Sequence, residues 1–463
     1  MTTELLLLTL WVLAQLALGL WVARRVRTED DFFVAGRRLG PWMAAASVFA
    51  TWFGAETCVG AAGQVHDSGL GALSVEPYAY GLCLLVMGLV FAVPLWRLGI
   101  TTLPDFFARR FGTATERVAA LVLMPASILW AAAQIRAFGT VLAGAAPSLD
   151  VGTGIAVAAV LAGLYTMLGG LLADVVTDLL QGGVLIVGLV LLLVAVTGDL
   201  GGASGLLDAA GERLAARTAG PSPGVLDVVE AWAIPICGSV VAQEVVSRSL
   251  AARSAGTARG AALGGGGVYL LVGTIPVVLG LVGGRLVPGL EDGEQLLPAL
   301  AREYLPMGLF VIFSGALVAA ILSTVDSALL VVGSLVERNL LLGRTASDAL
   351  RLRVARGAVL AAAGAAWWLA AGSDGVFALV ELASAFGSSG VLVCVVLGLF
   401  TRRGGQVSAL AALGTGAALW VLGDAGGHWP HPYLVSLGGA LVAYLGLSGL
   451  GVAERPVLGE VEA

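Results

Sequence analysis

Small and hydroxyl-bearing side chains lie along one face of an otherwise apolar stretch, residues 314–330. A helix of 3.6 residues per turn brings positions i, i+3, i+4 and i+7 onto one face. Here these positions are Ala320, Ser323, Thr324 and Ser327. One carbonyl and three hydroxyls on a common face can hold a small hard cation. Asp326, in the same stretch, costs roughly 2.5–3.5 kcal/mol at the centre of a membrane helix unless it meets a partner, a cavity or an ion. The pattern indicates an ion pathway.

The composition is that of a membrane protein. Hydrophobic residues make up 58% of the 463 residues and charged residues 12%, against about 25% charged in an ordinary soluble domain. Apolar stretches near the roughly 20 residues that cross a bilayer recur along the chain. We therefore expect an all-α, polytopic membrane protein of about thirteen transmembrane helices, surrounded by the lipid bilayer and with no nucleic-acid partner. The expected spans are approximately 4–23, 41–64, 75–95, 118–143, 152–171, 175–197, 226–247, 261–284, 306–335, 354–371, 375–399, 407–424 and 433–452.

Arginine predicts the orientation, because the chain has 25 basic residues and none of them is lysine. In the thirteen-span arrangement, twenty arginines, Arg248 and Arg338 among them, fall on one side. Loops rich in basic residues stay in the cytoplasm, so we expect the N-terminus outside and the C-terminus inside. The first span ends, rather than begins, with arginines and is expected to remain as a helix. The use of arginine without any lysine fits a GC-rich bacterial genome. The expected location is therefore a bacterial inner (plasma) membrane.

Enzyme chemistry finds no support in the residues. The four cysteines each lie within an expected span, so a disulfide framework is not expected. No phosphate-binding glycine loop and no CxxC zinc spacing occurs in the sequence. An intramembrane enzyme would need clustered His, Cys or Ser–His groups, which the sequence also lacks. We expect no catalytic residues.

Two expected spans contain residues that weaken helices. Residues 50–60, ATWFGAETCVG, place two glycines and a glutamate inside one span, and residues 233–243, AIPICGSVVAQ, place Pro235 and Gly238 inside another. Each broken span begins a block of five spans, and an odd number reverses the orientation of the second block. This arrangement is typical of inverted-repeat secondary transporters. The expected units are an extra N-terminal helix and cytoplasmic loop at 1–40, a first five-helix repeat at 41–198, an extracellular loop at 199–225, a second repeat at 226–400, and two C-terminal helices with a short cytoplasmic tail at 401–463.

Five segments of the chain resemble the sodium:solute symporter family, which has a LeuT-type fold. They are DFFVAGRRLGPW at 31–42, SVFATWFGAETCVG at 47–60, TTLPDFFARRFG at 101–112, GGLLADVVTDLLQG at 169–182 and GALVAAILSTVDSALL at 315–330. From the first to the last, these segments span nearly 300 residues, 31–330, and they follow the order of the family. The resemblance implies a ten-helix core, with one extra helix before it and two after it.

The resemblance also implies a sodium site between the broken second span and the hydroxyl-bearing helix. Its ligands would be the backbone carbonyls of Ala50, Phe53 and Ala320 and the hydroxyls of Ser323 and Thr324. Some members bind a second sodium ion nearer the cytoplasm, and the matching positions here are Asp178, Ser323, Asp326 and Ser327. This chain departs from those members, which carry a hydroxyl where it has Asp326. The carboxylate could strengthen a second sodium site, take up a proton, or pair with a nearby arginine.

The family's solute pocket is lined by the two broken spans and by facing positions on neighbouring helices. The matching positions are Trp52, Glu56, Tyr80, Trp130, Gln134, Ser239 and Gln243. Local patterns resemble the high-affinity choline transporters, in which aromatic faces attract a quaternary ammonium group. An aromatic residue of those proteins corresponds here to Ala242, which removes one wall of such a cage. Glu56 has a second interpretation, in which it satisfies backbone amides freed by the helix break.

We therefore expect a sodium-coupled symporter that imports a small polar organic solute by alternating access, with Na+ as the coupling ion. One alternative is a sensor or receptor module on the same fold, which would be expected to carry a long signalling region beyond Ala463. Another is a symporter coupled to protons. The identity of the solute, the number of sodium ions and the oligomeric state stay open at this point.

Overall fold

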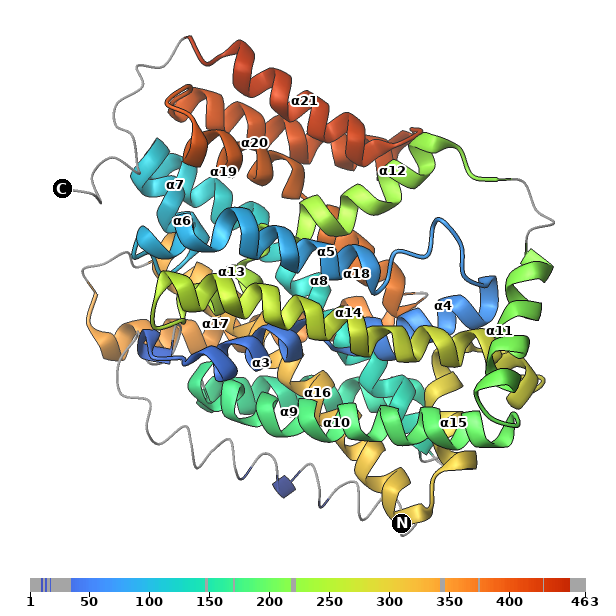
Figure 1. Ribbon diagram of the computed structural model, residues 1–463. Coiled ribbons are helices and arrows are strands. Elements are labelled where there is room, and N and C mark those ends of the chain that lie inside the picture. The colour runs from blue at the N-terminus through green and yellow to red at the C-terminus, as the bar shows by residue number, and fades with distance from the viewer. Residues whose placement is uncertain are drawn as a thin grey trace.

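Figure 1 shows a computed structural model of the chain, in which long helices run side by side. It describes residues 35–449 apart from 146–148, 170, 218–221, 342–345, 374 and 428, together with Leu10, Leu13, Ala14 and Ala17. No β-strand occurs among these residues, which agrees with the expected all-α class. The expected first span, 4–23, and the C-terminal tail lie almost wholly outside the described residues.

The described elements follow one another as helices and short helical turns. The first part of the chain forms η1 (Ala35–Arg37), α3 (Pro41–Trp52), η2 (Glu56–Gly60), α4 (Ala61–Ser68), α5 (Tyr78–Val86), η3 (Met87–Phe91), α6 (Ala92–Arg97), α7 (Leu103–Phe111), α8 (Thr113–Ala145), α9 (Val151–Gly169), α10 (Leu171–Asp199) and α11 (Ala203–Arg217). The rest forms α12 (Val225–Ala233), η4 (Ile234–Gly238), α13 (Gln243–Leu250), α14 (Ala255–Leu286), η5 (Gly293–Gln295), α15 (Leu296–Tyr304), α16 (Met307–Ser334), η6 (Leu335–Leu341), α17 (Asp348–Ala371), α18 (Val376–Ala385), α19 (Ser388–Phe400), α20 (Gln406–Val421), η8 (Leu422–Gly427) and α21 (Pro432–Gly446).

Seven helical stretches among the described residues are long and apolar enough to cross a membrane. Two bent pairs, α12–η4 with α13 and α18 with α19, raise the number to nine, and two shorter apolar helices accompany them. The expected count of thirteen is therefore not confirmed. The stretches 199–225 and 285–305, which the span pattern leaves as loops, contain the helices α11 and α15.

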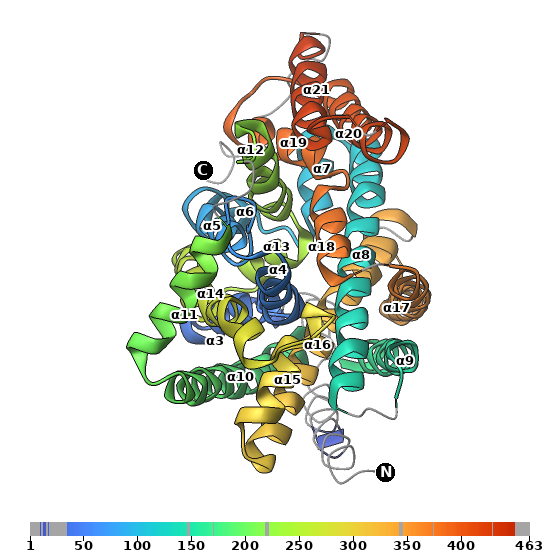
Figure 2. The ribbon, with the colours of Figure 1, turned by 90° about the vertical axis from the view of Figure 1, so that its right-hand side faces the viewer.

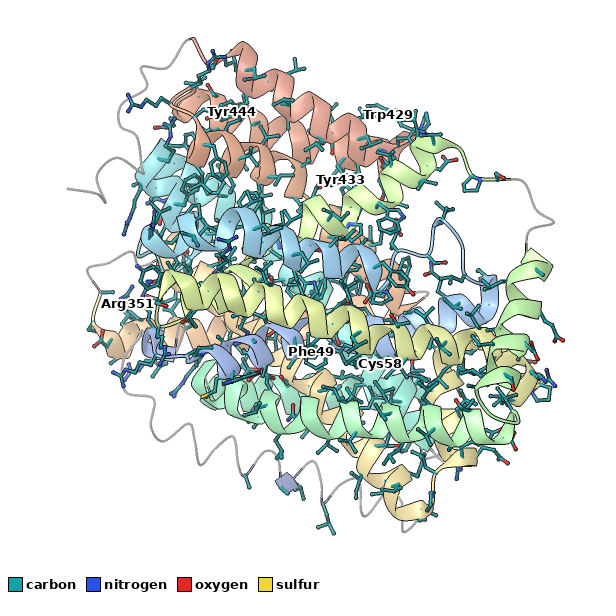
Figure 3. All side chains as sticks on the ribbon, in the orientation of Figure 1. Phe49, Cys58, Arg351, Trp429, Tyr433 and Tyr444 are labelled. Carbon is teal, nitrogen blue, oxygen red and sulfur yellow. The ribbon has the colours of Figure 1, made fainter. Side chains whose placement is uncertain are left out.

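Both helix breaks expected from the sequence are present. α3 ends at Trp52, and the chain resumes as a π-helical turn at Glu56. A Cβ atom at Gly54 would lie 2.8 Å from Gln134 Oε1, so glycine leaves room here for the Gln134 side chain. Figure 3 labels Phe49 and Cys58, on the two sides of this break, near the middle of the bundle.

The second break follows the π-helical turn η4, and α13 begins at Gln243 after a bend of 41°. A Cβ atom at Gly238 would lie 2.0 Å from the carbonyl oxygen of Ser384, so η4 and α18 approach each other at the backbone. A third break, which the hydropathy pattern does not reveal, separates α18 from α19 at Gly387, where φ is +66°.

α16 occupies the centre of the bundle. Of its most apolar 18 residues, 83% are buried, against 33–61% in the other six candidate spans. It contacts α8, α9, α10 and α17 as well as α3. The end-on view in Figure 2 shows α20 and α21 as an outer layer on α19, on the opposite side of the molecule from α10. The hydroxyl face of α16 is therefore enclosed by protein rather than by lipid.

α21 is attached at both ends to other parts of the chain. At its start, the carboxylate of Glu230 on α12 accepts the amides of Tyr433 and Leu434, at 2.6 and 2.9 Å. Free amides at a helix N-terminus favour an anion. Near its other end, the Tyr444 hydroxyl donates to the carbonyl oxygen of Arg403, between α19 and α20, at 2.9 Å.

Candidate sodium and solute site

The break after α3 leaves backbone carbonyls available at the centre of the bundle. The last helical bond of α3 runs from Phe53 N to Phe49 O at 2.8 Å. The final carbonyls of a helix have no partner within the helix. Ala50 and Phe53 stand in this last turn and its cap, and both are buried. The two carbonyls of α3 that the family resemblance assigns to a sodium site therefore belong to the end of this helix.

The hydroxyls of Ser323 and Thr324 on α16 donate their hydrogens to oxygen atoms of the protein. Thr324 Oγ1 donates its hydrogen to Ala320 O at 3.1 Å, and Ser323 Oγ donates its hydrogen to Asp178 Oδ1. A hydroxyl has one hydrogen and two lone pairs, so a hydroxyl that donates its hydrogen can still act as an acceptor or as a metal ligand. Asp178, on α10, thus fixes the direction of Ser323. The donor set of three carbonyls and two hydroxyls fits a hard monovalent cation.

The side chain of Arg248, on α13, connects the two sides of this site. Its Nε donates to Thr51 Oγ1 at 2.7 Å, and its NH2 group donates to Ser327 Oγ at 2.5 Å. Thr51 follows Ala50 in the chain, and Ser327 lies one turn beyond Ser323. The last turn of α3 and the hydroxyl face of α16 therefore meet around one guanidinium.

The four positions expected to form a second sodium site are only partly linked by observed contacts. Asp178 accepts from Ser323, and Ser327 Oγ donates to Ser323 O at 3.2 Å. Asp326 is fully buried on α16 beside Ser327. The span pattern leaves Arg248 in a loop, and this part of the expectation is wrong: the residue lies within α13 and is 1% exposed, and its guanidinium lies 3.8 Å from Asp178 Oδ2. Its position on the cytoplasmic side stays a prediction.

Three of the expected solute residues form an aromatic wall. The rings of Trp52 and Trp130 lie 5.2 Å apart, and the rings of Tyr80 and Trp130 lie 6.3 Å apart, edge to face. All three side chains are buried. Trp52 is the last residue of α3, so the aromatic wall begins two residues after the Ala50 carbonyl.

Gln134, on α8, joins the helix break to Glu56. Its Oε1 accepts from Ala55 N at 3.0 Å, and its Nε2 donates to Glu56 Oε2 at 2.6 Å. The freed amide is therefore satisfied by Gln134. In the described part of the chain, no group hydrogen-bonds to Glu56 Oε1 or to the indole nitrogens of Trp52 and Trp130. One acceptor and two donors thus remain for a ligand.

Ser239 belongs to the same region, whereas Gln243 does not join it. Ser384 Oγ lies 3.1 Å from Ser239 Oγ and 3.0 Å from the Tyr80 hydroxyl, which connects η4, α18 and α5. Gln243 Oε1 instead accepts from Leu103 N at 2.6 Å, at the start of α7. The sequence pattern does not single out Ser384, because this residue lies just before the third break, which hydropathy does not reveal.

A buried carboxylate that the sequence pattern does not single out lies beside the first break. Glu76 Oε1 accepts from Thr57 Oγ1 at 2.6 Å and from the Tyr269 hydroxyl, and Thr57 Oγ1 and the Tyr269 hydroxyl lie 2.7 Å apart. Thr57 lies in η2 and Tyr269 in α14. The cluster therefore fastens the chain after the break to α14.

Tyr269→Phe tests this role. It removes one hydrogen bond to a buried carboxylate, which costs about 1–3 kcal/mol. We expect the melting temperature of the purified protein to fall by a few degrees, while the sodium concentration for half-maximal binding stays unchanged. An unchanged melting temperature would show that the cluster does not stabilise the break.

The comparisons with known proteins agree on the family. The model of the sodium:solute symporter family matches residues 32–416. The human high-affinity choline transporter 1 is 28% identical over 358 residues, covering 70% of this chain, and the chain spans only 60% of that relative's length. The osmoregulated proline transporter OpuE of Bacillus subtilis is 26% identical over 442 residues, covering 89% of this chain and 88% of the relative.

Solved structures share the fold. A sodium-coupled sialic acid symporter in a substrate-bound outward-open state superposes with a TM-score of 0.83 at 21% identity, over 98% of this chain and 99% of that chain. Mhp1, a nucleobase-cation-symport-1 family transporter in a closed conformation, gives a TM-score of 0.64 at 16% identity, over 94% and 98% of the two chains. The expected LeuT-type fold is confirmed, and the chain is a multi-pass membrane protein. Because the family model covers most of its length, the chain belongs to the sodium:solute symporter family.

Proposed function

We propose that this protein is a sodium-coupled symporter that imports a small polar organic solute by alternating access. The observation that supports this most directly is the donor set at the first break. Carbonyls are freed at the end of α3, and α16, which contacts α3, carries hydroxyls whose hydrogens are already donated to protein oxygens. Family membership supports sodium as the coupling ion.

In this proposal, sodium and solute act on the same turn of the chain. A sodium ion held by Ala50, Phe53, Ala320, Ser323 and Thr324 ties the end of α3 to α16. Trp52 lies in that turn, so binding the ion also fixes one wall of the solute pocket. The ion stabilises one arrangement of the helices, and its release favours the other. No covalent bond is formed or broken in this process, and both sodium and the solute are transported.

The proposed solute carries a hydrogen-bond donor toward Glu56 and an acceptor toward an indole. Trp52, Trp130 and Tyr80 supply apolar ring faces, and Glu56 Oε1 supplies an acceptor that has no protein partner in the described part of the chain. Aromatic faces and a carboxylate together suit a solute with a positively charged nitrogen. Choline and proline, named in two relatives, are therefore the first probes.

The test is uptake of labelled choline, proline, a sugar and a nucleobase into proteoliposomes. We expect an inward sodium gradient to drive uptake of one probe, and an equal potassium gradient to drive none. Linkage requires that this solute raise the affinity for sodium by the same factor by which sodium raises the affinity for the solute. Equal binding of the solute in sodium and in potassium would contradict the proposal, and uptake driven by a pH gradient alone would favour proton coupling.

We extend the proposal to the architecture and orientation of the chain. The two expected repeats, 41–198 and 226–400, each begin with a broken helix, α3–η2–α4 and α12–η4–α13. With the repeats inverted, the two breaks meet at mid-membrane and surround the pocket from both sides. The arginine distribution supports an outside N-terminus and a cytoplasmic C-terminus.

A further inference from the structure

Beyond the proposed first sodium site, the side chains of Thr51, Asp178 and Ser327 form a cluster around a cation that the chain itself supplies, the guanidinium of Arg248. The guanidinium of Arg248 hydrogen-bonds to Thr51 Oγ1 at 2.7 Å and to Ser327 Oγ at 2.5 Å, and it lies 3.8 Å from Asp178 Oδ2. Arg248 and Asp178 are each 1% exposed. Oxygen atoms from α3, α10 and α16 therefore converge on one positively charged group from α13.

The hydroxyls in this cluster turn their lone pairs toward the guanidinium. Thr51 Oγ1 donates its hydrogen to Ser47 O at 2.7 Å, and Ser327 Oγ donates its hydrogen to Ser323 O at 3.2 Å. Each hydroxyl has a single hydrogen, so its remaining lone pairs can accept from Arg248. A hydroxyl that binds a metal ion has the same orientation. Thr51 and Ser327 are thus ligands of a cation, and that cation is a side chain.

The charge of Arg248 opposes a second metal ion among these oxygens. A guanidinium remains charged under all physiological conditions and holds its donors in a rigid fork. Its charge balances that of Asp178, one of the two carboxylates among the positions expected to bind a second sodium ion. A sodium ion there would also meet a like charge in a buried environment, where charges are poorly screened.

We propose that Arg248 is the resident cation of this cluster, in place of a second sodium ion, so that the protein binds one sodium ion per chain. The inference rests on the proposed sodium-coupled function and adds its stoichiometry. Asp178 then serves two cations. Its Oδ1 fixes the hydrogen of Ser323, a ligand of the first sodium ion, while its Oδ2 faces Arg248.

Equilibrium binding of radiolabelled sodium to the purified full chain tests the proposal without a known solute. The wild-type protein should bind about one sodium ion, with a Hill coefficient near one. Arg248→Met removes the charge and leaves Asp178 for a metal ion, so it should bind about two ions, with a Hill coefficient above one. Arg248→Lys keeps a positive charge in the same place and should still bind about one.

The number of sodium ions bound to the wild-type protein tests the proposal even if the Arg248→Met protein does not fold. Two sodium ions bound to the wild-type protein would overturn this inference and leave the proposed function standing. No bound sodium would overturn both. An Arg248→Met protein that melts as a folded protein and still binds one ion would also overturn the inference, because removal of the resident cation would then have opened no site.

Discussion

Thr324→Val is expected to raise the sodium concentration for half-maximal binding about tenfold. The substitution replaces a hydroxyl ligand with a methyl group and preserves the branched shape of the side chain. A loss of about 1.4 kcal/mol in binding free energy corresponds to a tenfold change. Because Thr324 is 1% exposed within an apolar helix, the added methyl should disturb folding little. Sodium titration of the purified protein, with its melting temperature measured alongside, gives both quantities.

Thr324→Ser is the matched control. It keeps the hydroxyl, which can still donate to Ala320 O, and removes only the methyl group. Its half-maximal sodium concentration should stay close to that of the wild-type protein. If Thr324→Val also binds sodium like the wild type, α16 does not contribute to the ion site, and the central argument for sodium coupling is lost.

Glu56→Gln is expected to weaken solute binding about 10- to 100-fold while sodium binding in the absence of solute is retained. Glutamine has the shape of glutamate, and its Oε1 can still accept from Gln134 Nε2. The oxygen that has no protein partner in the described part of the chain is then replaced by an amide NH2 group, which donates a hydrogen bond instead of accepting one. Hydrogen bonds to charged groups contribute about 1.5–3 kcal/mol, which sets the size of the effect. The affinity of the probe that shows sodium-driven uptake is the quantity to measure.

Glu76→Gln separates a solute contact from a general effect of removing a buried carboxylate. Glu76 is buried beside the same helix break, and its Oε1 accepts from Thr57 and Tyr269, while its Oε2 has no hydrogen-bond partner in the described part of the chain. This variant should lose thermal stability and keep its solute affinity. If Glu56→Gln leaves the solute affinity unchanged, Glu56 serves only to support Gln134 and the break.

The parts of the site that follow from local pattern are predictable from the sequence. The hydroxyl face of α16 is set by helical periodicity, and the two first breaks by glycine and proline within apolar spans. The pairing of Trp130 with Gln134 on one face of α8 follows from their spacing of four residues. In each of these cases a single element contains the information.

The parts that depend on which helices meet could not be predicted in this way. Arg248 stands at the end of an apolar stretch, where hydropathy assigns an arginine to a loop, and its burial depends on contacts of α13 with other helices, α3 and α16 among them. Glu76 lies before α5, and its partners are 19 and 193 residues away in the chain. Gln243 matches a solute position in sequence, yet the start of α7 takes its side-chain oxygen.

The attachment of α21 at both ends sets a limit on the range of motion of the bundle. One end is held by Glu230, on the helix that leads into the second break, and the other by the Arg403 carbonyl, beyond α19. A rigid helix between two anchors keeps their separation constant. α12 can therefore pivot about the start of α21, but it cannot draw away from the segment that follows α19 without breaking these hydrogen bonds. The outer helices α20 and α21 thus restrict which of the inner helices can move independently.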